Sequence, residues 1–103
     1  MKKLFISQPM RNKTIEEILA VREKAIKSAE KELGEKVTVI ESVLTDLHNS
    51  THPLCCLGKS LELLSTADVV YFAKGWEEAR GCRIEHTCAI EYELPLVIED
   101  YTK

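Results

Sequence analysis

Short apolar runs alternate with stretches of helical periodicity along the chain, and this alternation limits the fold more than any other feature. The helical patterns cover residues 14–33, 54–65 and 81–92, and they are flanked by apolar runs at residues 4–6, 37–40, 69–73 and 94–98. Parallel strands need long crossover connections, which are usually helices. The order β-α-β-α-β-α-β therefore predicts one α/β domain over residues 1–103, a flavodoxin- or Rossmann-like three-layer sandwich with a four- or five-stranded, mainly parallel sheet.

The ends of the first two predicted helices carry recognisable signals. Thr14 with Glu17 three positions later matches a capping box, and Gly34 ends the first pattern. Pro53 is a favoured first-turn residue at the start of the second pattern. That second pattern is more apolar than one sheet face requires, which predicts a subunit contact and a homodimer or larger homo-oligomer. Its apolar positions are Leu54, Cys56, Leu57, Leu61, Leu63 and Leu64.

Charge and hydropathy narrow the classes of partner. The chain has 103 residues, a formal charge of −3 and no block of basic residues, which argues against a nucleic-acid polymer as the main partner. Its apolar runs are far shorter than a membrane span, and the stretch after Met1-Lys2-Lys3 is too short for a signal peptide. We therefore expect a cytoplasmic protein that acts on a small molecule and has no membrane partner.

Cofactor and metal motifs are missing from the expected positions. Neither the loop after residue 6 nor the loop after residue 73 carries the glycines of a dinucleotide or Walker motif, so no cofactor is expected. The four cysteines Cys55, Cys56, Cys82 and Cys88 are interpreted as free thiols. A zinc set of His48, His52, Cys55 and Cys56 matches no usual ligand spacing, and we predict no metal site.

The segment from Asp68 to Glu85 is the strongest candidate for a functional site. A buried strand at residues 69–73 leads through a polar loop into the helical pattern that starts at Gly81, so Glu85 falls in or just after the first turn of a helix. Ligands of open α/β sheets bind beyond the carboxyl ends of the strands, and a helix N-terminus there stabilises negative charge. This placement predicts an ionised carboxylate at the edge of the sheet.

Three stretches resemble the nucleoside 2-deoxyribosyltransferase superfamily, and in particular its small bacterial and phage members. They are LFISQPMRNKT at residues 4–14, STADVVYFAKGW at residues 65–76 and GCRIEHTCAIEYELPLVI at residues 81–98. The resemblance extends to the 2′-deoxynucleoside 5′-monophosphate N-hydrolases. It implies cleavage or transfer at the N-glycosidic bond of a deoxynucleoside or its 5′-monophosphate.

The resemblance also implies roles for particular residues. Glu85 would be the nucleophile, and Gly81 would let the loop approach the sugar. Arg11 resembles the phosphate contact of the hydrolases, whose guanidinium pairs with two phosphate oxygens. The expected site is catalytic Glu85 with binding residues Phe5, Ser7, Gln8, Pro9, Met10, Arg11, Trp76, Glu78, Arg80 and Gly81.

Three positions depart from the family's pattern. The tyrosine that orients the nucleophile falls at Phe5, and an aspartate of the transferases falls near Ser60. The aspartate that protonates the leaving base falls near Ala79, where Glu78 and Arg80 are candidate substitutes. These departures affect both the rate and the choice of substrate, because a catalytic acid contributes roughly two to four powers of ten.

Structural roles compete with functional ones at several of these residues. Glu85 could simply complement the helix dipole, and Arg11 could be a solvated loop cation. Trp76 could stack on a nucleobase or cover the sheet edge. For His86 and Cys82 we expect packing roles. Two functions follow: an N-glycosidase or deoxyribosyltransferase, and a nucleotide-binding module of the same fold with weak or no turnover.

Overall fold

The computed structural model describes residues 1–40 and 53–99. The chain forms β1 (Lys2–Ser7), α1 (Ile15–Leu33), β2 (Val37–Val39), α2 (Pro53–Leu64), β3 (Val69–Phe72), the 3₁₀ helix η2 (Trp76–Glu78), α3 (Arg80–Glu91) and β4 (Leu96–Ile98). The three predicted helices are confirmed, and each boundary lies within one residue of its predicted position. No helix of the described ranges is both long enough and apolar enough to cross a membrane.

The four strands form one parallel sheet in the order β2-β1-β3-β4, as the alternating pattern predicted. β1 and β3 are the central strands, and their register pairs Ser7 with Phe72, so both strands end at the same edge. The backbone N–H of Ala73 extends this pairing by donating to the carbonyl of Ser7 at 2.9 Å. β2, the next strand along the chain, lies on one side of β1, and β3 lies on the other side. The edge where β1 and β3 end is therefore the switch point, the place where ligands of such sheets bind.

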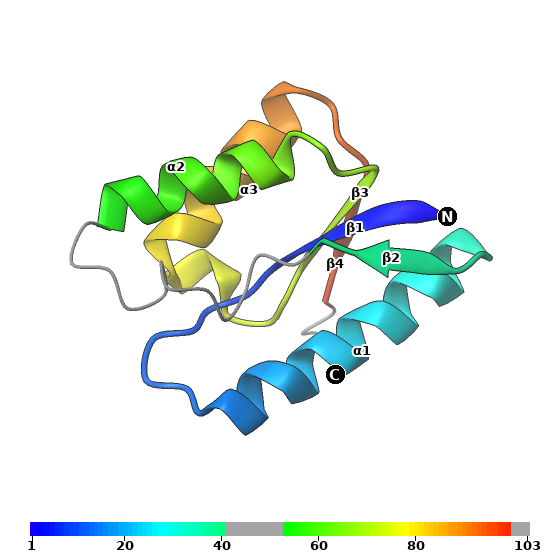
Figure 1. The fold of residues 1–103 in the computed structure, drawn as a ribbon, viewed down its shortest axis with the longest axis horizontal. Helices are drawn as coiled ribbons and strands as arrows, with labels where there is room; N and C mark the ends of the chain where they lie inside the picture. Colours follow the sequence, from blue (N-terminus) through cyan, green and yellow to red (C-terminus); the bar gives the residue numbers. More distant parts are fainter. Residues whose placement is uncertain (41–52, 100–103) are drawn as a thin grey trace.

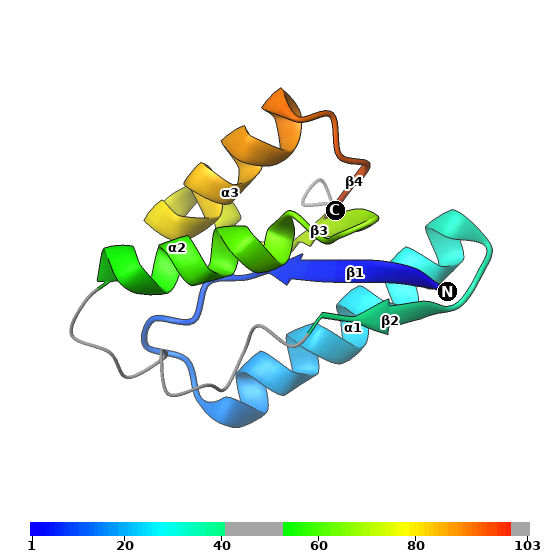
Figure 2. The ribbon, with the colours of Figure 1, turned by 45° about the horizontal axis from the view of Figure 1, so that its top comes forward.

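The two faces of the sheet carry separate apolar clusters because side chains alternate along each strand. Leu4 and Ile6 of β1 pack with Ala25 and Ala29 of α1. Phe5, from the opposite face of β1, packs with Leu64 of α2 and Ala89 of α3. Figures 1 and 2 show the same arrangement, with α1 on one side of the strands and α2 and α3 on the other.

Local caps explain why α1 begins and ends where it does. The Thr14 hydroxyl accepts from the backbone N–H of Glu17 at 3.1 Å, and the Glu17 carboxylate accepts from the backbone N–H of Thr14 at 2.8 Å. At the other end Gly34 has φ 70°, and its N–H donates to the carbonyl of Glu30. A left-handed residue at this position suits glycine, which lacks the Cβ that strains other residues there.

Two details differ from the sequence expectation. The last strand starts at Leu96 rather than at residue 94, because the backbone N–H of Leu94 donates to the carbonyl of Ala89 and closes the end of α3. The surplus apolar surface of α2 is also smaller than predicted. Leu61, Leu63 and Leu64 all belong to the cluster beneath α2, whereas Leu54 is 78% exposed.

Candidate active site

The carboxylate of Glu85 is held between two serine hydroxyls. Ser7, the last residue of β1, donates to Oε1 at 2.7 Å, and Ser60 of α2 donates to Oε2 at 2.7 Å. Glu85 itself lies just past the first turn of α3, as predicted, and is only 7% exposed. Three elements therefore fix one carboxyl group at the carboxyl edge of the sheet, and both of its oxygens have a hydrogen-bond donor.

Burial dominates the electrostatics of Glu85. Loss of water around the carboxylate raises its pKa, and the hydrogen bonds from Ser7 and Ser60 only partly offset this effect. Proximity to a helix N-terminus was expected to favour the ionised form, whereas burial acts in the opposite direction and raises the pKa. A helix end acts mainly within its first turn, and Glu85 lies beyond it in a site with little solvent.

Cys82 lies one turn before Glu85 on α3 and is 5% exposed. Burial raises the pKa of its thiol to about 11, and the negative charge of Glu85 acts in the same direction, against a hydrogen bond with Ser7. A thiol with this pKa is protonated at neutral pH and is a poor nucleophile. The packing role predicted for Cys82 agrees with this environment.

Trp76 packs within a group of three aromatic rings. Its ring stacks on His86 with centroids 4.2 Å apart and an interplanar angle of 22°. The ring of Phe72 lies 5.4 Å from Trp76 and 5.1 Å from His86. His86 occupies one face of the indole, and Trp76 also packs against the apolar cluster beneath α2 and α3, which favours the covering role of Trp76 over stacking on a nucleobase.

The β1–α1 loop brings the other predicted binding residues to the same edge but with different exposure. Gln8 is 5% exposed, Pro9 and Met10 are half-buried, and Arg11 is exposed. Side chains of consecutive strand residues point to opposite faces. Gln8 therefore faces α1, whereas Ser7 faces α2 and α3.

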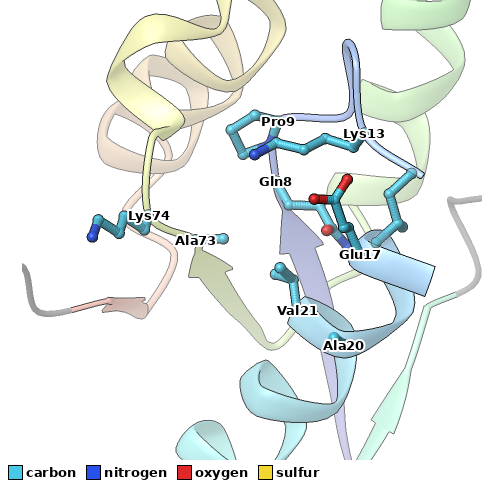
Figure 3. A pocket seen from close by; sticks show the side chains of 9 residues that line it. Gln8, Pro9, Lys13, Glu17, Ala20, Val21, Ala73 and Lys74 are labelled. Carbon is cyan, nitrogen blue, oxygen red and sulfur yellow. The ribbon is translucent and has the colours of Figure 1, made fainter. Parts of the chain in front are cut away.

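A hollow of about 280 Å³ lies on the α1 side of this loop, away from Glu85. Figure 3 shows Gln8, Pro9 and Lys13 around one part of it, with Val21 and Ala73 opposite. The lining residues are Gln8, Pro9, Lys13, Glu17, Ile18, Ala20, Val21, Ala73 and Lys74. Of the predicted site residues, the structure thus places Ser7 with Glu85, and Gln8 and Pro9 at a second position.

The remaining predicted residues surround these two positions. Phe5 is 1% exposed and lies in the apolar cluster beneath α2 and α3. Glu78 and Arg80 are exposed in the segment that leads into α3. Gly81 is half-buried, and a Cβ there would meet no atom within 4 Å, so the space in front of this residue is open.

Ser60 is the residue that the sequence reasoning undervalued. It was noted only as the position where an aspartate is missing, yet it binds one oxygen of Glu85. Its spacing could have indicated an inward direction, because Cys56, Ser60 and Leu64 follow one another at four-residue intervals and Leu64 is buried.

Only two of the four residues in the zinc set lie within the described residues. Cys55 and Cys56 lie at the start of α2, and His48 and His52 fall outside the described residues. Within the described residues no group of three or more histidine, cysteine or acidic side chains is placed to hold a metal ion.

Comparison with known proteins found no match among protein-family models, curated proteins or solved structures.

Proposed function

We propose that this chain cleaves or transfers at the N-glycosidic bond of a deoxynucleoside or deoxynucleoside 5′-monophosphate, with Glu85 as the nucleophile. The observation that carries the proposal is the fixed carboxylate at the sheet's ligand-binding edge, with both oxygens held by Ser7 and Ser60. A nucleophile that is already oriented avoids much of the entropy loss of the reaction. The resemblance noted in the sequence supplies the substrate class.

The reaction would proceed in two displacements. A Glu85 oxygen attacks the anomeric carbon as the bond from that carbon to the base nitrogen breaks, and the base leaves with the electron pair and takes up a proton. Glu78, exposed at the edge of the site, is the candidate donor of that proton. Water or a second base then attacks the same carbon and releases the Glu85 carboxylate.

The hydroxyls of Ser7 and Ser60 assist both the attack by Glu85 and its release. Their hydroxyls stabilise the negative charge that Glu85 carries before attack and regains after release, and they hold one side-chain rotamer in between. They also provide hydroxyl groups at the nucleophile, where the family resemblance expects a tyrosine and this chain has Phe5.

Released base is the direct measurement. The protein is incubated with a panel of 2′-deoxynucleosides and their 5′-monophosphates, with and without an acceptor base, and the products are separated by chromatography. Glu85→Gln should lower the rate by orders of magnitude, because the amide keeps the shape and loses the nucleophile. Glu91→Gln, an exposed carboxyl group on the same helix, serves as the matched control and should retain the rate.

A binding module without turnover is the second candidate, and the burial of Glu85 favours it. A carboxylate that is 7% exposed is hard for a sugar to reach, and the same burial raises its pKa. Saturable binding of a nucleotide without release of base, in wild-type protein and in Glu85→Gln alike, would support this candidate and refute the enzymatic one.

We also propose that copies of this chain associate with one another in the cytoplasm. Leu54 at the start of α2 is 78% exposed, and covering it by a second copy would remove apolar surface from water. Light scattering should show a dimer or larger assembly, and Leu54→Glu should shift the mass towards that of the monomer. A monomeric wild-type protein at tens of micromolar, about the working range for stable subunit contacts, would contradict the proposal.

A further inference from the structure

The side-chain amide of Gln8 is buried without a hydrogen-bond partner. Gln8 is 5% exposed, and neither Oε1 nor Nε2 bonds to any group in the parts of the chain that the structure describes. A carboxamide offers two donors and two acceptor sites, so the whole hydrogen-bonding capacity of this side chain is unused. Unpaired buried polar groups destabilise a fold, and chains retain them where water or a ligand supplies the partner.

The hollow beside Gln8 is large enough for a ligand. Its volume is about 280 Å³, against roughly 30 Å³ for a water molecule in the liquid and roughly 300 Å³ for the smallest typical small-molecule pockets. Ile18 and Ala73, both nearly fully buried, and the half-buried Val21 provide apolar walls. The space is therefore larger than a few waters need and suits a compact molecule with a flat apolar part.

Polar groups occur at a few places around these walls. In Figure 3 the Gln8 amide points towards Glu17 and Val21, Lys13 extends across the hollow beside Pro9, and Lys74 points away. The Glu17 carboxylate already accepts from the backbone N–H of Thr14. Among the buried side chains of the described lining, Gln8 is therefore the one with unmet hydrogen bonds, and its broad terminal torsion lets the plane of the amide rotate to suit a partner.

The complement of a carboxamide is another planar amide. An amide edge places one N–H beside one C=O, and two such edges pair through two parallel N–H···O bonds that satisfy both Gln8 atoms at once. We propose that the hollow between β1, β3 and α1 is a binding site for a small planar amide, open-chain or cyclic, that pairs with Gln8 and lays its flat face on Ile18, Val21 and Ala73.

This site is separate from Glu85. Ser7 is the last residue of β1 and Gln8 follows it, and the Gln8 side chain lies with residues of α1 whereas the Ser7 side chain contacts Glu85 of α3. Occupation of the hollow therefore does not require the glycosidic chemistry of Glu85, and the inference stands independently of the proposed function.

An isosteric pair of probes tests the proposal on the unaltered chain. Benzamide carries the planar ring and the amide edge, whereas acetophenone has the same shape, no charge and no N–H donor. Benzamide is titrated into ¹⁵N-labelled protein and followed by the backbone amide signals of Gln8, Val21 and Ala73. We expect saturable shifts with a dissociation constant of about 1 mM, which is the range for a ligand of this size, and at least about tenfold weaker binding of acetophenone.

Variants separate the role of Gln8 from the rest of the wall. Gln8→Leu keeps a similar volume and removes both unpaired atoms, so it should weaken benzamide binding about tenfold or more and raise the thermal midpoint. Glu85→Gln, on the opposite face, should leave benzamide binding unchanged.

Several outcomes would overturn the inference. Absence of shifts at about 10 mM benzamide, ten times the expected constant, would mean that the hollow does not bind planar amides. Equal binding of acetophenone, or unchanged benzamide binding in Gln8→Leu, would remove Gln8 from recognition. A lower midpoint in Gln8→Leu would show that the folded chain itself satisfies the amide.

Discussion

Replacing Glu85 by Gln should make the protein more stable at neutral and alkaline pH. Burial raises the pKa of Glu85 above the 4.5 of an unperturbed glutamate, so the folded chain holds this proton more tightly than the unfolded chain does. By linkage, stability falls as pH rises from 4.5 through the raised pKa, and it stays reduced at higher pH. Glutamine has the shape of the protonated carboxyl group and never acquires the charge. The variant should therefore match wild type at low pH and exceed it above the folded pKa.

The size of the gain follows from the same shift. Each unit by which folding raises a carboxyl pKa lowers stability at high pH by about 1.4 kcal/mol. For a chain of this length, 1 kcal/mol moves the thermal midpoint by roughly 4–8 °C, so one unit corresponds to roughly 5–11 °C. One serine hydroxyl can still donate to the Gln oxygen while the other accepts from its NH₂ group, but the second hydroxyl then has no acceptor for its own proton, and this offsets part of the gain.

Thermal unfolding between about pH 4 and pH 8 measures this difference directly. Wild type, Glu85→Gln and the exposed control Glu91→Gln are followed by circular dichroism under identical conditions. Only Glu85→Gln should show a midpoint advantage that grows with pH. A variant that is less stable than wild type at pH 8, or an advantage independent of pH, would refute the burial argument.

Three further outcomes test the environments around the site. Ser60→Ala should lower the free energy of unfolding at neutral pH, measured by urea denaturation, by about 1.5–3 kcal/mol, because it removes a hydrogen bond to a buried charge. The control Ser65→Ala, on the surface, should change this free energy by less than about 0.5 kcal/mol. Cys82 should resist iodoacetamide at pH 8, since burial raises its pKa to about 11, and rapid labelling in the folded state would contradict this. Although burial raises the pKa of Glu99, the hydrogen bonds to its carboxylate lower it overall. Glu99→Gln should thus lose stability at pH 7, and this loss should vanish as pH falls through the folded pKa.

The order and type of the elements were predictable because local signals agree with the global fold. The capping box at Thr14 and the left-handed Gly34 set the ends of α1 in the structure as they do in the sequence. The start of β4 was not predictable from hydropathy. Leu94 is apolar like the strand residues that follow, but it closes the end of α3, and only the hydrogen bond to Ala89 distinguishes the two roles.

The position of Glu85 was predictable from topology, whereas its environment was not. A carboxylate early in the helix after β3 must lie near the carboxyl edge of the sheet. Its contact with Ser60 depends on how α2 packs beside α3, which no local pattern specifies. The direction of its pKa shift depends on burial, which is likewise a property of the packed molecule.

The position of Ser7 explains how a chain with Phe5 can still offer a hydroxyl to Glu85 from the same strand. Residues 5 and 7 point to the same face of β1, because side chains alternate, and they lie about 6.6 Å apart along a parallel strand. Phe5 fills the apolar cluster with Leu64 and Ala89, while Ser7 sits one step nearer the open edge and bonds to Glu85. If Ser7 supplies the missing function, Phe5→Tyr should not raise the rate of base release, because it adds a hydroxyl to a site where both carboxylate oxygens already have donors. Ser7→Ala should lower the rate, and if Phe5→Tyr then restores it in the double variant, the two hydroxyls are interchangeable. A rate that is unchanged in Ser7→Ala would show that the proposed nucleophile, Glu85, does not depend on this contact.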